Sequence, residues 1–456
     1  MAGSTKLIRN LNQLGCGSPI SVRGWIRSIR RHKDTSFLVV NDGTNKDGVQ
    51  IVYKKGGDVA DKLTNGAAID ISGMLMKCPS ARHNSDREII AESIRIVGPC
   101  DASVYPVQKK YHTNEFLRRN QHLRGRTAEF SSTMRIRSSA AQAIHSFFTN
   151  RQFQWIHAPI ITASDCEGAG EVFEVKPASE PKSPTSDEAE FFGTRAYLTV
   201  SAQLHAEIFA CSIGPVYTFG PTFRSENSNT SRHLAEFWMV EPEIPYADLD
   251  VLCNTAEDLV KHCVTNALTN DESDLDQLLG DKDEARASLI TCSEKDFARI
   301  TYSEAIQILQ NCSIKFQHEP VWGRGLQTEH ELYLASHHFK RPVFVTDYPG
   351  AIKPFYMKRS AKSDQIVACL DLLLPRIAEV VGGSERIDDV NELLTSMKTR
   401  NIDESKMDWY IDLRRFGSIP HGGFGLGFDR LIQFIGGISN IRDVVPVPRV
   451  PGSCLY

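Results

Sequence analysis

The chain has 456 residues, too many for one ordinary domain, so we expect two or three. Its 41% hydrophobic and 24% charged residues are typical of a globular protein with a large core, and no apolar run approaches the length of a membrane helix. A net charge of −4 excludes a general attraction to nucleic acid, so such a partner would have to meet local basic patches. The 11 cysteines form no C-x-x-C pair, which argues against a zinc site and for a reducing compartment.

Residues 20–100 contain short β-like runs separated by turn residues. About five such strands predict a small barrel, for which the oligonucleotide-binding type is a frequent case. Arg27 belongs to an early basic cluster, beside which an exposed aromatic side chain could stack a base. The pattern alone favours a core position for Phe37. The expected strands are 20–26, 36–40, 49–53, 68–76 and 88–97.

Basic residues recur between 104 and 127, where they indicate either a hinge that touches a phosphate backbone or a solvated charged linker. From residue 129 the pattern changes to helical spacing over 130–150, followed by a strand over 153–161. We therefore expect a barrel domain over 1–104, a hinge over 105–127 and a larger domain over 128–456.

In the larger domain, helices are expected at 249–268 and 303–309, and strands at 341–347 and 353–357. The acidic stretch 270–284 is expected to be a solvated surface. Lys353 could approach a bound nucleic acid, but a solvated lysine is the simpler expectation.

The stretch 217–243 reads as two strands joined by a long polar loop, with unusually many charges on the strands. A hairpin with a solvated charged face would be the default interpretation. Arg224, however, can fork two phosphate oxygens, Arg232 and His233 could reach a polyphosphate, and Phe237 offers a flat face for a base. A glycine-rich strand running into a helix at 422–431 allows close approach to a ligand and adds a further cation, Arg430.

The segment FRSENSNTSRHLAEFWMVEPE resembles the second signature motif of class II aminoacyl-tRNA synthetases, and GLGFDRL resembles the third. The wording TFRSENSNTSRHLAEFWM is similar to the asparaginyl family of bacterial or organellar type, and the resemblance covers essentially the whole chain. It implies an α+β fold: an N-terminal OB-type β-barrel, followed by a class II catalytic domain with an antiparallel sheet flanked by helices. Residues 130–161 are similar to the first motif, which implies a homodimer.

The resemblance also implies roles for individual residues. Arg224 and Arg430 would be catalytic, and Glu379 and Asp371 would bind Mg²⁺. The residues implied in ATP binding are Arg224, Glu226, Arg232, His233, Leu234, Phe237, Glu379, Gly427 and Arg430. Those implied in amino-acid binding are Glu167, Ser201, Gln203, Glu241, Gly382 and Arg386. Those implied in anticodon binding are Phe37, Gln50, Glu88 and Arg27.

One position favours asparagine over aspartate as the substrate. Aspartate-charging relatives carry a lysine where this chain has Ala206, and a neutral amide needs no such cation. Arg386 would then donate to the amide oxygen. Glu241 would accept from the amide nitrogen, or it could be only the salt-bridge partner of Arg386.

The implied reaction is ATP-dependent attachment of L-asparagine to tRNA(Asn) through an asparaginyl-adenylate, with Mg²⁺ and no membrane partner. Two alternatives stay open: an aspartyl-tRNA synthetase, including a relaxed one, and a tRNA-binding paralogue without charging activity. An amide-forming asparagine synthetase on the same scaffold is disfavoured by the barrel. The motifs favour the mitochondrial matrix over the cytoplasm, although the first 15 residues carry no clean transit signal.

Overall fold

The computed structural model describes residues 5–54, 59–78, 86–164, 171–178 and 191–456. The chain divides into two compact units. The first comprises residues 1–136 and 272–280, and the second comprises 137–271 and 281–456.

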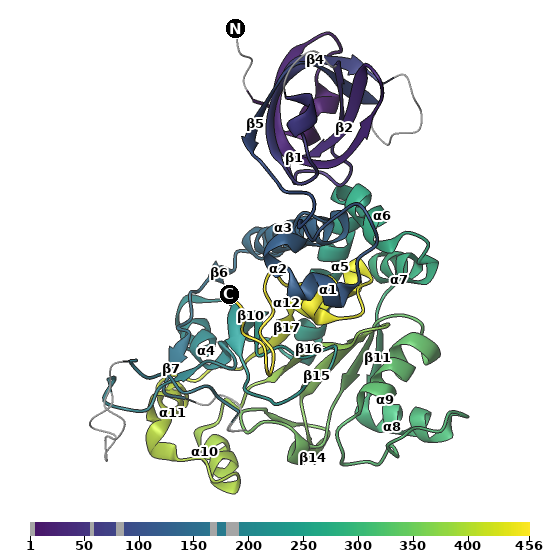
Figure 1. Ribbon diagram of the computed structural model, residues 1–456. Helices are drawn as coiled ribbons and strands as arrows, with labels where there is room; N and C mark the ends of the chain where they lie inside the picture. The colour runs from purple at the N-terminus through teal and green to yellow at the C-terminus, as the bar shows by residue number, and fades with distance from the viewer. Residues whose placement is uncertain (1–4, 55–58, 79–85, 165–170, 179–190) are drawn as a thin grey trace. The chain divides into compact units, whose positions relative to one another are not determined.

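The first unit is built on a closed five-stranded barrel (Figure 1). Neighbouring strands follow the order β1-β2-β3-β5-β4, and all pairs are antiparallel except β3 with β5. Each of the five runs expected from the sequence lies within one observed strand, which confirms the barrel. The strands are β1 (Pro19–Arg31), β2 (Thr35–Asn41), β3 (Val49–Lys54), β4 (Ala68–Lys77) and β5 (Arg87–Gly98).

Strand β2 shows how the barrel is filled. Ser36, Leu38 and Val40 are buried, and Leu38 and Val40 belong to the apolar barrel core. Because successive side chains point to opposite faces of a strand, Phe37 lies on the outer face, where it is only half-buried. The expectation of a core position for Phe37 was therefore wrong.

Short helices accompany the barrel in the first unit. They are α1 (Asn114–Arg119), α2 (Gln121–Arg124), the beginning of α3 (Ala128–Asn150) and α6 (Glu272–Leu279). The acidic stretch that was expected to be solvated thus contains a helix, and it buries its leucines while Asp274 accepts hydrogen bonds from Arg135 at 2.6 and 2.8 Å. Acidic composition does not prevent burial when the apolar residues fall on one helix face.

The second unit is built on an eight-stranded sheet in the order β11-β12-β15-β16-β17-β10-β9-β6 (Figure 1). Its pairs are antiparallel except β11 with β12 and β6 with β9. The strands of the sheet are β6 (Gln154–Trp155), β9 (Val216–Phe223), β10 (Glu236–Pro245), β11 (Ala298–Thr301), β12 (Val343–Thr346), β15 (Cys369–Leu374), β16 (Ala378–Glu385) and β17 (His421–Gly427). Two small sheets pair β7 (Ile161–Thr162) with β8 (Tyr197–Leu198) and β13 (Arg359–Ser360) with β14 (Ser363–Val367).

Helices α5 and α12 pack against the central strands of this sheet. A side chain at Gly422 of β17 would meet Leu252 of α5 at 2.9 Å, so this face of β17 is closed by the helix. The neighbouring Gly423 faces the opposite side, which carries the candidate site. The remaining helices are α4 (Gln203–Ile213), α5 (Leu249–Asn270), α7 (Asp283–Glu294), α8 (Tyr302–Asn311), α9 (Thr328–Leu332), α10 (Val390–Thr399), α11 (Asp408–Arg415) and α12 (Phe428–Gly436).

Two expected strands differ from the structure. The strand expected over 153–161 shrinks to β6 and the start of β7, and residues 353–357 form no strand of the sheet. Pro159 and Pro354 lie in these segments, and proline removes a donor from the ladder. Within the described residues, no helix combines the length and the apolar character that crossing a bilayer requires.

Candidate active site

The candidate site lies on the face of the sheet opposite α5, along strand β10. Phe237, Met239, Glu241 and Glu243 occupy alternate positions of this strand and therefore share one face. Since β10 pairs with β9 on one side and β17 on the other, both long motifs of the sequence meet here.

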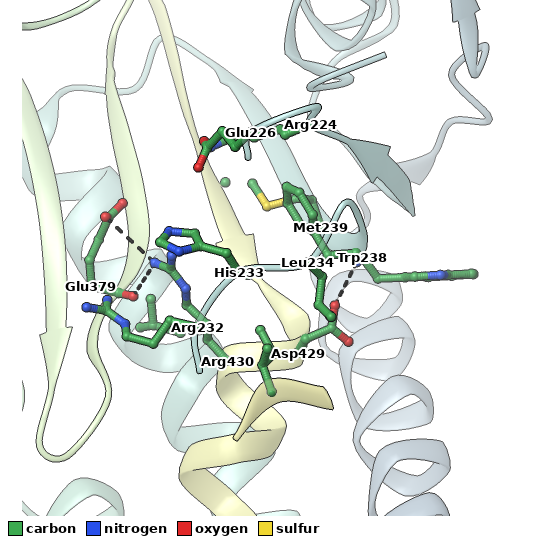
Figure 2. A pocket seen from close by; sticks show the side chains of 15 residues that line it. Arg224, Glu226, Arg232, His233, Leu234, Trp238, Met239, Glu379, Asp429 and Arg430 are labelled. Carbon is green, nitrogen blue, oxygen red and sulfur yellow. Dashed lines mark hydrogen bonds and ion pairs between the residues drawn. The ribbon is translucent and has the colours of Figure 1, made fainter. Parts of the chain in front are cut away.

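A cavity opens at the Phe237 end of this face. All nine residues predicted to bind ATP line it, although they come from the loop after β9, from β10, β16 and β17 and from α12. Figure 2 shows Arg232, His233, Glu379 and Arg430 grouped on one side of the cavity, with Arg224 and Glu226 on another. The further lining residues, to which the sequence analysis assigned no individual role, are Trp238, Met239, Val380, Gly425, Asp429 and Ile441.

The cationic side chains of the cavity are held by specific contacts. The guanidinium of Arg224 lies 5.4 Å from the centroid of the Phe237 ring. Arg232 Nη1 donates to Thr328 Oγ1 at 2.6 Å, and Arg430 Nη1 donates to the backbone oxygen of Glu379 at 2.8 Å. Burial and the charge of Arg430 lower the pKa of Arg232, as expected where several cations crowd one partly desolvated site. Three arginines converging on one cavity form a site for a multiply charged anion.

His233 adds a titratable group to the same cavity. Its Nδ1 lies 3.0 Å from Ser228 Oγ and 2.7 Å from Thr230 Oγ1, so the polar loop fixes the ring orientation. Burial lowers the pKa of His233, and the nearby arginines lower it further. A bound polyphosphate would oppose this shift, because its negative charge favours the imidazolium.

The two predicted metal ligands lie on the neighbouring strands β15 and β16. A Cβ built on Gly382 would lie 3.3 Å from Glu379 Oε1 and 3.5 Å from Asp371 Oδ1, so this glycine leaves space between the carboxylates. Two carboxylates beside an anion site match the hard oxygen ligands that Mg²⁺ prefers. Burial raises the pKa of Asp371, whereas Lys353 lowers it by donating to both oxygens at 2.9 and 2.7 Å. Lys353 is thus a largely buried partner of Asp371, and the expectation of a solvated lysine was wrong.

Glu331 on α9 lies next to Glu379 and Arg232, and the sequence analysis did not predict it. Its Oε2 accepts from the backbone nitrogen of Glu379 at 3.3 Å and lies 3.8 Å from Arg232. Burial and the charge of Glu379 raise the pKa of Glu331 to about 7. No motif surrounds Glu331, so only its place in the fold could reveal it.

Further along β10, Glu241 anchors the beginning of α4. Its carboxylate accepts from Ser201 Oγ, from the backbone nitrogen of Ala202 at 3.0 and 3.2 Å, and from Thr218 Oγ1 at 3.4 Å. The structure therefore brings together two residues predicted to bind the amino acid, Ser201 and Glu241.

The acid that pairs with Arg386 is Glu243. Arg386 Nε and Nη2 donate to the two Glu243 oxygens, each at 2.9 Å, and Nη1 donates to Ser384 Oγ at 2.9 Å. Both partners are almost fully buried. The suggestion that Glu241 might be the salt-bridge partner of Arg386 was wrong. Glu243 shares the strand face of Glu241, so the two-residue alternation was the signal that could have identified it.

A second buried cluster lies next to this pair. Glu207 on α4 accepts from Tyr410 Oη at 2.8 and 3.0 Å and from Arg414 Nη2 at 2.7 Å, and it lies 3.0 Å from His421 Nε2. Although burial opposes it, the charge of Arg414 and the contact with His421 hold the pKa of Glu207 below its ordinary value. Gln203, a further predicted amino-acid ligand, donates to Glu207 at 3.1 Å.

One ligating atom each from Glu207, Glu243 and His421 lies within 4.8 Å of the others. Guanidinium and phenol groups already bind these carboxylates, so we assign no metal to them. Glu167, the last predicted amino-acid ligand, lies outside the described residues.

Three of the four predicted anticodon residues lie at outward-facing positions of neighbouring barrel strands, and two of them are in contact. Gln50 Nε2 donates to Glu88 Oε2 at 2.7 Å, and Phe37 lies on the adjacent strand, with the guanidinium of Arg30 5.2 Å from its ring centroid. Arg27 lies elsewhere, beside a bulge of β1: burial lowers its pKa, and its charged neighbours are Arg126 and Arg135. The structure therefore does not place Arg27 with the other three.

Comparison with known proteins identifies the family. Residues 113–451 match the model of tRNA synthetases class II (D, K and N), and residues 20–97 match that of the OB-fold nucleic acid binding domain. Asparagine–tRNA ligase of Microcystis aeruginosa is 47% identical over 440 residues, with 95% of each chain covered. The enzyme of Thermosynechococcus vestitus is 46% identical over 457 residues, with 98% of each covered. This chain belongs to the asparagine–tRNA ligase family.

A solved structure agrees with this membership. Asparaginyl-tRNA synthetase from Pyrococcus horikoshii, complexed with asparaginyl-adenylate, superposes with a TM-score of 0.86 at 30% identity, with 97% of each chain covered. The family fold expected from the motifs, an OB barrel followed by a class II catalytic domain, is confirmed.

Proposed function

We propose that this protein is an asparagine–tRNA ligase that activates L-asparagine with ATP and transfers it to tRNA(Asn). The observation that carries the proposal is the convergence of Arg224, Arg232, His233 and Arg430 on one cavity next to the buried Arg386–Glu243 pair. In this proposal, the nucleotide and the amide side chain of the substrate would bind side by side along β10. The relatives and the adenylate complex of the Pyrococcus enzyme support this reading over an aspartyl enzyme or a non-charging paralogue.

In the proposed reaction, the asparagine carboxylate attacks the α-phosphorus of ATP, and pyrophosphate leaves. Adenine lies against Phe237, Glu226 accepts from its amino group, and Arg224 contacts the α-phosphate. Arg232, His233 and Arg430 hold the β- and γ-phosphates. No side chain serves as a nucleophile, so the residues act by positioning and by stabilising charge.

Mg²⁺ would be held by Glu379, with Asp371 as a second carboxylate. The ion would neutralise phosphate charge and help to orient the triphosphate. Glu379 suits this role because its side chain is partly exposed to the cavity, whereas Asp371 also binds Lys353.

ATP–pyrophosphate exchange without tRNA tests the activity. We expect exchange with asparagine and none with aspartate at equal concentration, since no cation stands at Ala206 to receive a second carboxylate. Exchange with aspartate alone would revive the aspartyl alternative. No exchange from folded protein would favour the non-charging paralogue.

We further propose that the barrel face around Phe37, Gln50 and Glu88 reads the anticodon. Stacking a base on an aromatic ring contributes roughly 1–3 kcal/mol. Phe37→Ala should therefore lower kcat/KM for tRNA charging about tenfold or more and leave tRNA-independent exchange unchanged. Val97→Ala, also exposed on the barrel, is the control. Equal charging by both variants would rule out stacking on Phe37.

We propose a homodimer formed through the edge of the large sheet. Strand β6 ends the sheet, and an apolar groove beside it is lined by Trp155, Pro159, Ile160, Phe219 and Trp238, of which Trp155, Ile160 and Trp238 are substantially exposed. Such a patch marks an interaction site. Sedimentation equilibrium should give twice the chain mass of 50.9 kDa, and a monomer at micromolar concentration would contradict the dimer.

A further inference from the structure

The cluster of Glu207, Tyr410, Arg414 and His421 is not explained by substrate contacts. All four residues are buried, and they come from α4, α11 and the first residue of β17. Burying so many ionisable groups is costly unless their charges are balanced. The way in which these buried charges are balanced therefore indicates the role of the cluster.

The charges of the cluster and of the adjacent pair nearly cancel. Two carboxylates, Glu207 and Glu243, face two guanidiniums, Arg386 and Arg414. His421 has both ring nitrogens next to acceptors, the backbone oxygen of Ile419 at 2.8 Å and Glu207 Oε2 at 3.0 Å, and Arg414 Nη2 lies 3.5 Å from its Nε2. Within the part of the chain that the structure describes, Glu207 is thus the acid that pairs with Arg414 and also contacts His421.

Glu207 also follows directly on Ala206, the position that argues against aspartate. Both side chains are buried on α4. Ala206 supplies no cation. Glu207 forms an ion pair with Arg414 and contacts His421. One carboxylate oxygen of Glu207 lies within 4.8 Å of one of Glu243, the ion-pair partner of Arg386. Because charges interact strongly in a poorly solvated interior, the charge of Glu207 alters what Arg386 can bind.

We infer that Glu207 is a specificity-determining positioning residue, whose carboxylate neutralises Arg414 and so leaves no surplus positive charge to receive an aspartate side chain. The inference rests on the proposed function, in which Arg386 meets the side chain of the substrate amino acid. Without the Glu207 charge, Arg414 could also draw Glu243 away from Arg386. The surplus positive charge and the release of Arg386 from Glu243 would each favour the binding of aspartate.

Substitutions that change the net charge of the cluster in opposite directions distinguish this role from a merely structural one. Glu207→Gln adds one positive charge to the cluster, Arg414→Gln removes one, and the double variant restores the balance. A structural role predicts losses that do not depend on the charge of the ligand. The charge role predicts opposite shifts in aspartate binding and partial recovery in the double variant.

The experiment measures the inhibition constant of aspartate against asparagine-dependent ATP–pyrophosphate exchange, with circular dichroism as the check of folding. We expect this constant to fall about tenfold in Glu207→Gln, to rise in Arg414→Gln, and to return to within about threefold of wild type in the double variant. An unchanged constant, or a shift of both single variants in the same direction, would overturn the inference.

If Glu207→Gln does not fold, the inference is tested by Arg414→Gln alone, from the direction in which the inhibition constant of aspartate shifts. The proposed function fails separately, because it predicts asparagine exchange by the wild-type protein before any variant is made.

Discussion

Arg224→Ala is expected to lower asparagine-dependent pyrophosphate exchange by roughly two orders of magnitude while leaving the protein folded. Arg224 lines the cavity beside Phe237, and a guanidinium can bind two phosphate oxygens at once. By analogy with the loss of one oxyanion donor, its removal should cost about 3 kcal/mol of transition-state stabilisation, or roughly two orders of magnitude in rate. The measurement is kcat for exchange at saturating ATP and asparagine.

The fold should persist because Arg224 is only half-buried and lies in the loop after β9 rather than in the core. Arg415→Ala is a matched control: this arginine lies on α11, is partly exposed and does not line the cavity. Exchange at the wild-type rate in Arg224→Ala would contradict the assigned role. A loss of equal size in Arg415→Ala would mean that the effect is not local.

Gly423→Ala is expected to disrupt the amino-acid pocket and to destabilise the second unit. A Cβ at this position would lie 2.0 Å from Glu243 Oε2 and 2.4 Å from the backbone oxygen of Pro242. Gly423 pairs directly with Glu243 across β10 and β17, so neither strand can yield without breaking the pairing or the Arg386–Glu243 ion pair. Breaking a buried pair typically costs roughly 3–5 kcal/mol.

Thermal unfolding followed by circular dichroism measures this loss, and asparagine-dependent exchange should become undetectable in parallel. Gly325→Ala is the control, because a Cβ there meets nothing within 4 Å. Two results together would contradict this prediction: an unchanged unfolding temperature and an unchanged KM for asparagine in Gly423→Ala. They would mean that the close packing of Glu243 against Gly423 does not maintain the Arg386–Glu243 pair.

The barrel and the long motifs were predictable because their signals are local. Alternation with period two defines a strand wherever turn residues bound it, and the five barrel strands follow from that rule alone. The ATP residues from Arg224 to Phe237 lie on one hairpin, so their proximity in the sequence already implied proximity in space. Glu379 was assigned only through the family resemblance, whereas Arg430 also followed from the glycine-rich strand that runs into a helix. The sheet order β16-β17-β10 is what brings them to the same cavity.

Where both faces of a strand carry apolar residues, the sequence cannot tell which face is inside. Strand β2 has Leu38 and Val40 on one face and Phe37 and Val39 on the other, and the small Ser36 is buried while Phe37 is outside. The barrel pairing decides this by placing Phe37 opposite Val52 on the outer face, two residues along β3 from Gln50, where a base could reach it.

The sequence by itself determined the family and the two kinds of structural unit, and it predicted the residues proposed for the anion site, because most of these lie in contiguous motifs. Only the tertiary structure decided how the buried charges pair: Arg386 with Glu243 rather than Glu241, Lys353 with Asp371, and Glu207 with Arg414. These partners lie 18 to 207 positions apart in the chain. A buried ion must find an opposite charge at hydrogen-bond distance, and which one it finds depends on the packing of distant elements that no local pattern encodes.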